Sequence, residues 1–463
     1  METLQRTANR GSVSTGYDIS NSVKLEDTNT EYLQRPASGS DGNRRTMTLS
    51  MWLKRTQPGN DHIFYSQGDH VRFRFKTSDY FSLRLANGHE FENESRVFRD
   101  PAAWSHMVVA IDTTQSTNSD RVKIYWNGVQ ETDFDTAQYP DLNEEFTLGQ
   151  FSSVTTQLGF FTESGYGFDG YITEVNYIDG SQLAPTQFGE FESDSGIWIP
   201  KKYTGSYGSE GFFLNFDNSG SMGADSSGNS NNFNLINVSA SNQATDTCTN
   251  NFCTLNPVVN FKYTTNGIIN GATEFGDNTG GGVGGAFGTF AVTSGKWYWE
   301  MKLVQQNSHN IGVSAIDDGD NVTASNDPQD INSTFNFNIS AARIEYFNGG
   351  SKVNGSLDAF ADFHTDGDII SIALNMDDNQ ISIFGNGTLQ SSVANSGLFD
   401  AANKMVVPFH ATINDTVQYN FGGFSVWTPS SVATDENGFG SFEFAPPSGY
   451  LALCSKNLGS SGG

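Results

Sequence analysis

The chain has 463 residues, with 52 Asp and Glu against 25 Lys and Arg, which gives a formal net charge of -27. A chain of this length holds two or three domains, each large enough for its own core. The acidic balance argues against nucleic-acid binding, which needs a surface rich in Lys and Arg. Charged residues make up only 17% of the chain and aromatic residues 13%, with 36 Phe and 49 Gly. This composition favours a β-rich, turn-rich fold over a helical or disordered one.

The sequence shows no targeting signal and contains only three cysteines. Residues 1–15 lack the apolar segment of a secretory signal, and no run of about 18 apolar residues occurs. We therefore expect no export signal and no membrane insertion. Cys248, Cys253 and Cys454 cannot form a disulfide framework, because one of three must stay unpaired. Cys248 and Cys253 either close a small disulfide loop or remain free thiols.

A polar segment rich in Ser, Thr and Asn, 239–256, separates two halves of similar style. We interpret it as the boundary between two domains. The predicted organisation is an N-terminal arm (1–20), a first β-sandwich (21–240), a linker (241–256), a second β-sandwich (257–458) and a flexible C-terminal tail (459–463).

The first half is predicted to form short strands between turn residues. Asn127-Gly128 is a strong hairpin turn signal. Residues 107–111 are apolar without alternation, which is typical of a strand covered on both faces. The predicted strands are 48–55, 71–76, 80–85, 104–112, 122–126 and 171–178.

Strict alternation in 71–76 predicts that Val71, Phe73 and Phe75 face the core while three cations face outward. A row of like charges on a protein of net charge -27 is repulsive unless something neutralises it. Two interpretations stay open: a solubilising face balanced by acids of the adjacent strand, or a docking face for an acidic neighbour or an anionic glycan. The candidate partner-binding residues are Arg72, Arg74, Lys76 and Arg84.

The second half repeats the pattern. Residues 297–303 and 370–374 alternate, and 381–384 runs into a second hairpin signal, Asn386-Gly387. The segments 122–130 and 381–390 share the same order of strand, Asn-Gly turn and strand. We therefore predict an all-β chain of two related sandwiches in tandem.

Three other motifs have residue types found in catalytic, nucleotide-binding or calcium sites. Glu131, Asp133 and Asp135 are spaced for one strand face, as a glycosidase with a Glu, Asp, Glu set needs, but the third position is Asp135 instead of Glu, so a solvated hairpin face is the better interpretation. The glycines of 280–285 fit a dinucleotide pattern, yet no predicted helix follows them, which indicates a loop. The cluster Asp317, Asp318 and Asp320 is either a solvated acidic turn or a calcium site.

No transition-metal site is predicted, because the seven His are scattered without metal-ligand spacing. We therefore expect no cofactor, with calcium at the 317–320 cluster as the alternative.

Residues 21–192 resemble a laminin G-like domain of the concanavalin A superfamily, a jelly-roll of two antiparallel sheets. The resemblance is carried by 48–54, 104–112, 124–128, 146–149 and 168–175. Residues from about 256 to 458 resemble a SPRY domain of the same superfamily, carried by 295–300, 311–314, 367–374 and 417–422. The resemblances imply two tandem concanavalin A-like jelly-roll sandwiches.

The opening segments 32–35, 42–46 and 52–55 resemble the variant of this domain in structural proteins of tailed phages. This resemblance implies a virion protein, either a tail fibre or adhesin or a head appendage. Its expected partners are other virion proteins and a host surface glycan or receptor. A homo-oligomer is expected, with a trimer favoured, because several copies add avidity to weak sites.

We thus expect a non-enzymatic, structural and adhesive protein. Two alternatives remain: a glycan-degrading hydrolase on a concanavalin-like fold, and a cellular peptide-binding SPRY adaptor.

Overall fold

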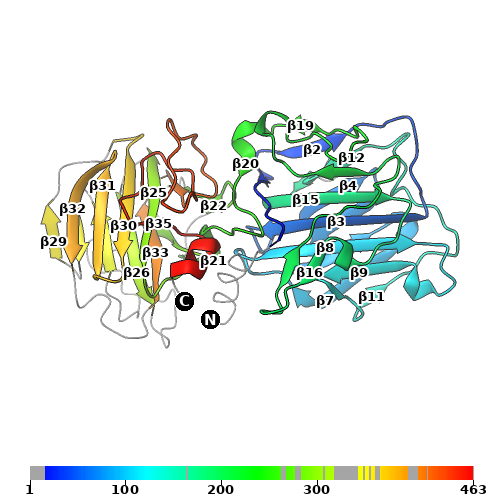
Figure 1. Cartoon of the computed structure of the whole chain (residues 1–463), viewed down its shortest axis with the longest axis horizontal. Coiled ribbons are helices and arrows are strands. Elements are labelled where there is room, and N and C mark those ends of the chain that lie inside the picture. Colours follow the sequence, from blue (N-terminus) through cyan, green and yellow to red (C-terminus); the bar gives the residue numbers. More distant parts are fainter. Residues whose placement is uncertain are drawn as a thin grey trace. The chain divides into compact units, whose positions relative to one another are not determined.

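The computed structural model describes residues 16–162, 165–261, 267–276, 283–305, 308–316, 343–347, 350–353, 356–359, 365–394, 405–413 and 416–461. These residues form β-sheet almost throughout (Figure 1). They divide into two compact units, the first ending at Thr249 and the second beginning at Asn250. Each unit contains two large sheets, almost wholly antiparallel, so the prediction of an all-β tandem of sandwiches is confirmed.

The first sheet of the first unit has the order β10-β9-β8-β3-β15-β1-β20, with β18 paired to β15. Asn127 and Gly128 connect β9 to β10 with φ of 48° and 79°, the positive values that a tight hairpin turn requires. The strands of this sheet are β1 (Ser22–Leu25), β3 (Thr46–Arg55), β8 (Trp104–Asp112), β9 (Val122–Trp126), β10 (Val129–Gln130), β15 (Gly170–Asp179), β18 (Phe212–Leu214) and β20 (Gln243–Ala244).

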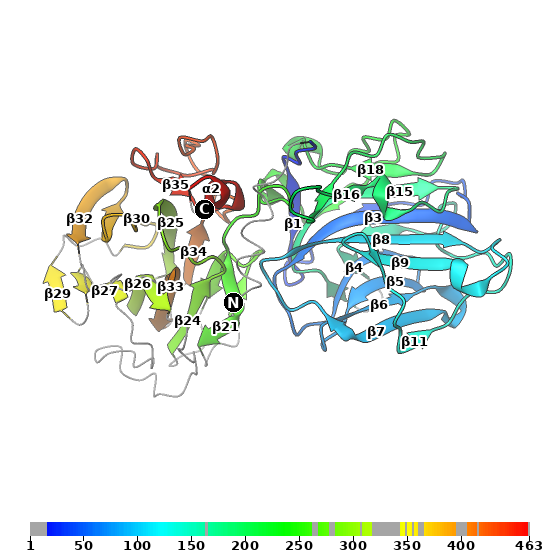
Figure 2. The ribbon, with the colours of Figure 1, turned by 60° about the horizontal axis from the view of Figure 1, so that its bottom comes forward.

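The second sheet has the order β11-β7-β6-β5-β4-β12-β2-β19 and lies against the first (Figure 2). Two small hairpins, β13–β14 and β16–β17, supplement the sandwich. The strands of the second sheet and the hairpins are β2 (Tyr32–Arg35), β4 (His62–Gln67), β5 (Val71–Phe75), β6 (Tyr80–Arg84), β7 (Glu90–Val97), β11 (Thr136–Ala137), β12 (Thr156–Leu158), β19 (Asn234–Ile236), β13 (Phe160–Phe161), β14 (Tyr166–Gly167), β16 (Gly189–Phe191) and β17 (Trp198–Pro200).

The core lies between these sheets and follows from strand alternation. On β5, Val71, Phe73 and Phe75 are buried while Arg72 and Arg74 are half-buried, as the sequence predicted. Burying each large apolar side chain contributes about 1.5–3 kcal/mol. The alternation therefore fixes which face of β5 carries the cations.

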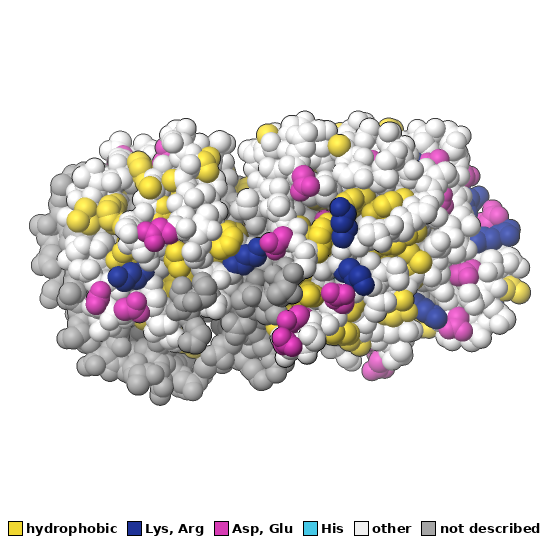
Figure 3. Space-filling model, in the orientation of Figure 1, with side chains coloured by type: hydrophobic (Ala, Val, Ile, Leu, Met, Phe, Trp, Pro, Cys, Tyr) yellow, Lys and Arg dark blue, Asp and Glu magenta, His cyan; other side chains and the backbone are white. Residues whose placement is uncertain are grey.

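The outer face of the first sheet is covered as well, which explains why 107–111 does not alternate. His106 lies between two indole rings, with ring centroids 4.8 Å from Trp52 and 5.9 Å from Trp198 on the β16–β17 hairpin. Figure 3 shows hydrophobic side chains gathered over this side of the unit. Phe188 and Tyr203 stack there with centroids 5.1 Å apart.

The predicted linker is not a solvated segment, because most of its polar side chains are buried, and one residue of the predicted arm, Ile19, is buried as well. Within 241–256, β20 pairs with β1, and the Asp246 carboxylate accepts a hydrogen bond from the buried Lys54 ammonium at 2.7 Å. In the predicted arm, Ile19 is buried and its backbone N–H donates to Thr249 Oγ1 at 3.1 Å. The first unit therefore extends to Thr249, although the domain limits as a set stay a prediction.

The second unit has one sheet of order β21-β24-β33-β26-β27-β28-β29 and one of order β22-β23-β34-β25-β30-β31-β32, with β35 paired to β25. Its elements are β21 (Leu255–Phe261), β22 (Ile268–Ile269), β23 (Glu274–Gly276), β24 (Val283–Gly288), β25 (Lys296–Gln305), β26 (Ser308–Ile316), β27 (Arg343–Phe347), β28 (Gly350–Val353), β29 (Ser356–Ala359), β30 (Ile369–Asn375), β31 (Gln380–Gly385), β32 (Thr388–Ala394), β33 (Met405–Ile413), β34 (Thr416–Asn420), β35 (Leu451–Ala452) and the helix α2 (Ser455–Ser461).

Both faces of β25 are buried, because the C-terminal segment covers its outer side. The Glu300 carboxylate accepts hydrogen bonds from Tyr298 Oη at 3.0 Å and from the backbone N–H groups of Glu443 and Phe444 at 2.9 and 2.8 Å. Burial raises the pKa of Glu300 to about 7. The predicted C-terminal tail overlaps α2, which extends to Ser461.

Candidate functional site

The predicted cationic residues lie together on the outward face of β5 and β6. Arg72 lies opposite Arg84 in the β5–β6 register, and Arg74 lies opposite Ser82. Directly opposite residues of antiparallel strands have Cβ atoms about 4.5–5.5 Å apart. The structure therefore brings Arg84 beside the row that alternation predicted for β5.

Two of the four cations have acidic partners. The Arg74 guanidinium lies 3.5 Å from a Glu90 carboxylate oxygen and 4.0 Å from one of Asp61. Lys76 Nζ lies 3.4 Å from a Glu92 carboxylate oxygen. Glu90 and Glu92 belong to β7, which is separated from β5 by β6. These two cations fit the interpretation of a solubilising, charge-balanced face.

Arg72 and Arg84 form a different arrangement, because among the described residues no carboxylate lies within 4 Å of either guanidinium. Arg72 stacks on Phe161, with Cζ 4.1 Å from the ring centroid, and donates a hydrogen bond to the Asp69 carbonyl at 3.3 Å. Its buried Nε has no hydrogen-bond partner in the part of the chain that the structure describes. Burial lowers the pKa of Arg72 and the charges of Arg84 and Arg74 lower it further, while the charges of Asp61 and Asp69 act in the opposite direction.

The surroundings of this guanidinium pair are polar and partly enclosed. Ser66 lies opposite Arg72 on β4, and Gln157 lies opposite Ser66 on β12. The β13–β14 hairpin is fixed over these strands, because Ser66 Oγ donates to the Phe160 carbonyl at 2.9 Å. The hairpin thus forms a wall beside Arg72. An anion that entered here would meet two planar guanidinium groups, which suit bidentate hydrogen bonds to carboxylate or sulfate.

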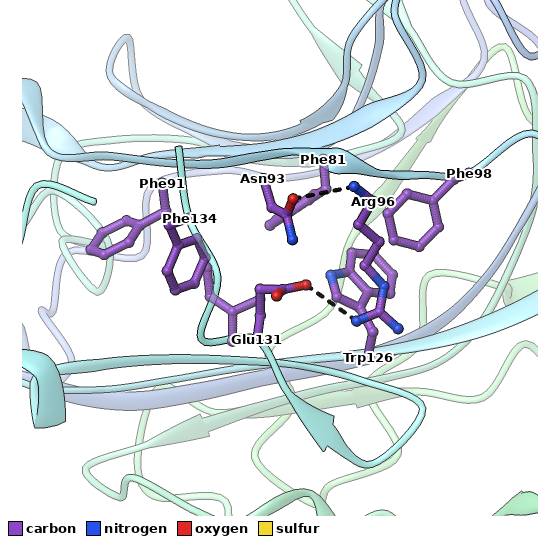
Figure 4. A pocket seen from close by; sticks show the side chains of 9 residues that line it. Phe81, Phe91, Asn93, Arg96, Phe98, Trp126, Glu131 and Phe134 are labelled. Carbon is purple, nitrogen blue, oxygen red and sulfur yellow. Dashed lines mark hydrogen bonds and ion pairs between the residues drawn. The ribbon is translucent and has the colours of Figure 1, made fainter. Parts of the chain in front are cut away.

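A second feature, a pocket at the edge of the same sandwich, was not predicted (Figure 4). It holds about 230 Å³ of empty space, part of it open to solvent, and lies between β6 and β7 of one sheet and β9 of the other. Five of its nine lining residues are aromatic. The apolar lining residues are Phe81, Phe91, Phe98, Ile124, Trp126 and Phe134.

Three polar side chains line the same pocket. Arg96 Nη1 and Glu131 Oε2 form an ion pair at 3.2 Å, with the two side chains 37% and 10% exposed. Asn93 Oδ1 accepts hydrogen bonds from the backbone N–H groups of Ser95 and Arg96 at 2.9 and 3.2 Å. This turn interrupts the pairing of β7 with β6, where the register shifts between Tyr80 and Ser82. Such bulges re-aim side chains and are common beside binding sites.

The sequence predicted a solvated hairpin face for Glu131, Asp133 and Asp135. Glu131 lines the pocket, whereas Asp135 Oδ2 accepts a hydrogen bond from Glu94 N at 2.7 Å and Asp133 is exposed. Residues 131–135 are not a strand, so the three carboxylates do not share a strand face. The polar run 93–96 within β7 (Glu90–Val97) was the signal that could have indicated the bulge.

The remaining candidates give no further site. Asp317, Asp318 and Asp320 lie outside the described residues. No group of three or more metal-ligating side chains occurs within the described ranges. Cys248, Cys253 and Cys454 are buried free thiols. Of the glycine-rich segment, the part from Val283 belongs to strand β24, and no helix of the described chain has the length and hydropathy to cross a membrane.

The two facing sheets and their strand order define the first unit as a concanavalin A-like jelly-roll. Residues 27–184 match a laminin G family model described as the concanavalin A-like lectin/glucanases superfamily. This match confirms the laminin G-like prediction for the first unit.

Among solved structures, the SPRY domain of human HERC1 is 20% identical, with a TM-score of 0.26, over 36% of this chain and 96% of that chain. The PSpry domain of TRIM65 is 11% identical, with a TM-score of 0.25, over 36% of this chain and 91% of that chain. No curated protein matches the chain.

Proposed function

We propose that the chain is a non-enzymatic adhesive and structural protein that binds an anionic ligand through the Arg72–Arg84 pair. The observation that carries this proposal is that neither guanidinium of the pair has a carboxylate of the described residues within 4 Å, although Glu90 lies opposite Arg84 in the β6–β7 register. In a chain with 52 acidic and 25 basic residues, Arg72 and Arg84 lie opposite each other in the β5–β6 register, which places two cationic side chains on one face of the sheet. Like charges placed directly opposite are destabilising, so a bound anion would remove a repulsion that the free protein carries.

The ligand class follows from this geometry. A carboxylate or sulfate group accepts two parallel hydrogen bonds from one guanidinium and is attracted to a second. Anionic glycans and acidic protein surfaces both offer such groups, and of the two we propose an anionic glycan on a host surface. The virion setting rests on the phage-like segments 32–35, 42–46 and 52–55. The proposal also includes neighbouring virion subunits as partners, a SPRY-like fold for the second unit and assembly of the chain as a homo-oligomer.

The matched substitutions Arg72→Ser and Arg74→Ser test the binding site. Both residues lie on the same face of β5, but of the two only Arg74 has carboxylates of the described residues within 4 Å. Exposed charge pairs contribute about 0.2–1 kcal/mol each. Arg72→Ser alone should therefore weaken binding to dextran sulfate or polygalacturonate by up to about fivefold at low ionic strength, and Arg72→Ser combined with Arg84→Ser by up to about 30-fold. Arg74→Ser should change it by less than about threefold.

Equal losses for Arg72→Ser and Arg74→Ser would show that the binding is non-specific. No binding of either polymer by the unsubstituted chain would refute the proposed function. Antibody labelling of purified phage particles, imaged by electron microscopy, tests the virion setting separately. Light scattering at micromolar concentration tests the oligomer.

A further inference from the structure

We propose that the Arg72–Arg84 pair binds the carboxylate of a hexuronate residue whose pyranose ring lies on the exposed ring of Tyr166. This inference rests on the proposed function and deepens it, because it narrows the anionic glycan to one whose carboxylate is bonded directly to the sugar ring. Three features carry it: a hairpin fixed beside the pair, the stacking of Arg72 on that hairpin, and the position of Tyr166.

The β13–β14 hairpin is fixed against the face of the second sheet that carries Arg72. Gln157 Oε1 accepts hydrogen bonds from the Thr162 backbone N–H and hydroxyl group at 3.3 and 3.0 Å. Phe160 stacks on Tyr32 with ring centroids 5.0 Å apart. These contacts add to the hydrogen bond from Ser66 to the Phe160 carbonyl. The hairpin therefore offers a ligand a surface that is already in place before binding.

The stacking of Arg72 sets the plane in which a carboxylate would be held. Arg72 Cζ lies 4.1 Å from the centroid of the Phe161 ring, and Nη2 donates to the Asp69 carbonyl at 3.3 Å. Because Nε is buried, Nη1 and the remaining N–H of Nη2 are the donors left for a ligand. A carboxylate that accepts two parallel hydrogen bonds from these donors lies in the guanidinium plane. Arg84, opposite on β6, attracts the same negative charge.

Tyr166 lies next to the ring on which Arg72 stacks. It is opposite Phe161 in the β13–β14 register, so the two side chains share one side of the hairpin with Cβ atoms about 4.5–5.5 Å apart. Phe161 is 1% exposed, whereas Tyr166 is 48% exposed. The hairpin thus gives one aromatic ring to the guanidinium group and leaves the neighbouring ring open to a ligand.

This arrangement distinguishes among anionic ligands. In a hexuronate the carboxyl carbon is bonded to the pyranose ring, so a carboxylate held in the guanidinium plane brings the sugar ring to the adjacent aromatic side chain. The apolar C–H groups of a pyranose can then pack on the face of Tyr166. A sulfate ester is tetrahedral and is joined to its sugar through an oxygen, so it does not fix the ring in this way. An acidic protein side chain has no ring to place there.

Isothermal titration calorimetry of the full chain at low ionic strength tests the proposal with trigalacturonate and with polyacrylate, which has carboxylates but no sugar ring. Tyr166→Ala should weaken trigalacturonate binding about tenfold, because the ring contact is lost. The same substitution should change polyacrylate binding by less than about twofold. Tyr166→Phe keeps the ring and should recover the binding of trigalacturonate. Phe191→Ala is the matched control, because it removes a side chain of similar exposure, 53%, from the separate β16–β17 hairpin, and should leave both affinities unchanged.

The outcomes separate this inference from the proposed function. If Arg72→Ser with Arg84→Ser weakens trigalacturonate binding but Tyr166→Ala does not, the ring contact is wrong and the anion site stands. The same conclusion holds if Tyr166→Ala weakens both probes equally, if Tyr166→Phe fails to recover binding, or if the unsubstituted chain binds polyacrylate alone. If the unsubstituted chain binds neither probe, both proposals are refuted.

Discussion

Substituting Asp246 with Asn tests whether the polar segment before Thr249 belongs to the fold. Lys54 Nζ and Asp246 Oδ2 are 2.7 Å apart, with side chains only 0% and 2% exposed. Trp104 Nε1 donates to the other carboxylate oxygen at 3.0 Å. An Asn side chain offers one acceptor oxygen, so its NH₂ group would face either the ammonium or the indole N–H, both of which are donors.

The expected loss follows from burial. Removing one partner of a buried ion pair leaves an uncompensated charge and is destabilising by about 3–5 kcal/mol. With a urea slope of about 2–3 kcal/mol/M, the unfolding midpoint of the first unit should fall by roughly 1–2 M. Substituting both partners together, Lys54→Met with Asp246→Leu, removes the stranded charge and should restore part of the stability, because the Trp104 indole N–H still loses its bond to Asp246.

Urea denaturation of the full chain, followed by tryptophan fluorescence, measures these shifts. The matched control is Glu190→Gln, which breaks the exposed Lys201–Glu190 pair, 3.5 Å apart with side chains 50% and 54% exposed. Such pairs contribute about 0–1 kcal/mol. If Asp246→Asn shifts the midpoint no more than this control does, then the segment is a linker as the sequence suggested, and the reasoning from burial is refuted.

Three further predictions concern buried groups and glycines of the first unit. Burial raises the pKa of Glu174 from 4.5 to about 8, so the folded state binds an extra proton in this window and stability should fall as pH rises through it. Glu174→Gln should abolish that slope in urea titrations at pH 5 and pH 8, and an unchanged slope would contradict the assignment. Burial lowers the pKa of His106 from 6.5 to about 3, so stability should fall as pH drops below 6.5. Nitrogen-15 NMR at pH 5 should show a neutral ring protonated on Nε2, because Trp198 donates to Nδ1 at 3.0 Å; a charged ring there would exclude this. Gly128→Ala should destabilise the first unit by about 1–3 kcal/mol more than Gly59→Ala in thermal denaturation. Both glycines have positive φ, but only at Gly128 would an added Cβ lie 2.4 Å from the Trp198 ring. Equal losses would mean that backbone strain is the whole effect.

Strand positions could be predicted because they depend on local patterns. The alternation of Val71, Phe73 and Phe75 and the turn at Asn127-Gly128 both reflect interactions within one hairpin. The burial of Asp246 could not be predicted in the same way. Its partner Lys54 is 192 residues away in the sequence. The polar residues around Asp246 do not indicate that its carboxylate pairs with a buried cation on a distant strand.

In the candidate sites, too, the local features could be predicted from the sequence and the contacts between distant segments could not. Alternation placed Arg72 and Arg74 on one face, but the difference between them depends on Glu90, which reaches past β6 to Arg74 alone. The edge pocket was missed because its walls come from two sheets. Phe91 and Trp126 become neighbours only when β7 and β9 pack in the sandwich.

The closure of the first unit by its two ends has a mechanical consequence. The strands nearest those ends, β1 and β20, pair with each other, and Thr249 Oγ1 donates to the Ile19 carbonyl at 3.0 Å. A pulling force applied between Ile19 and Thr249 is therefore borne by the short β1–β20 pairing and the Ile19–Thr249 hydrogen bonds. The long strands β3, β8 and β15 stay out of its path, so tension would peel β20 away before it strained the face that carries Arg72.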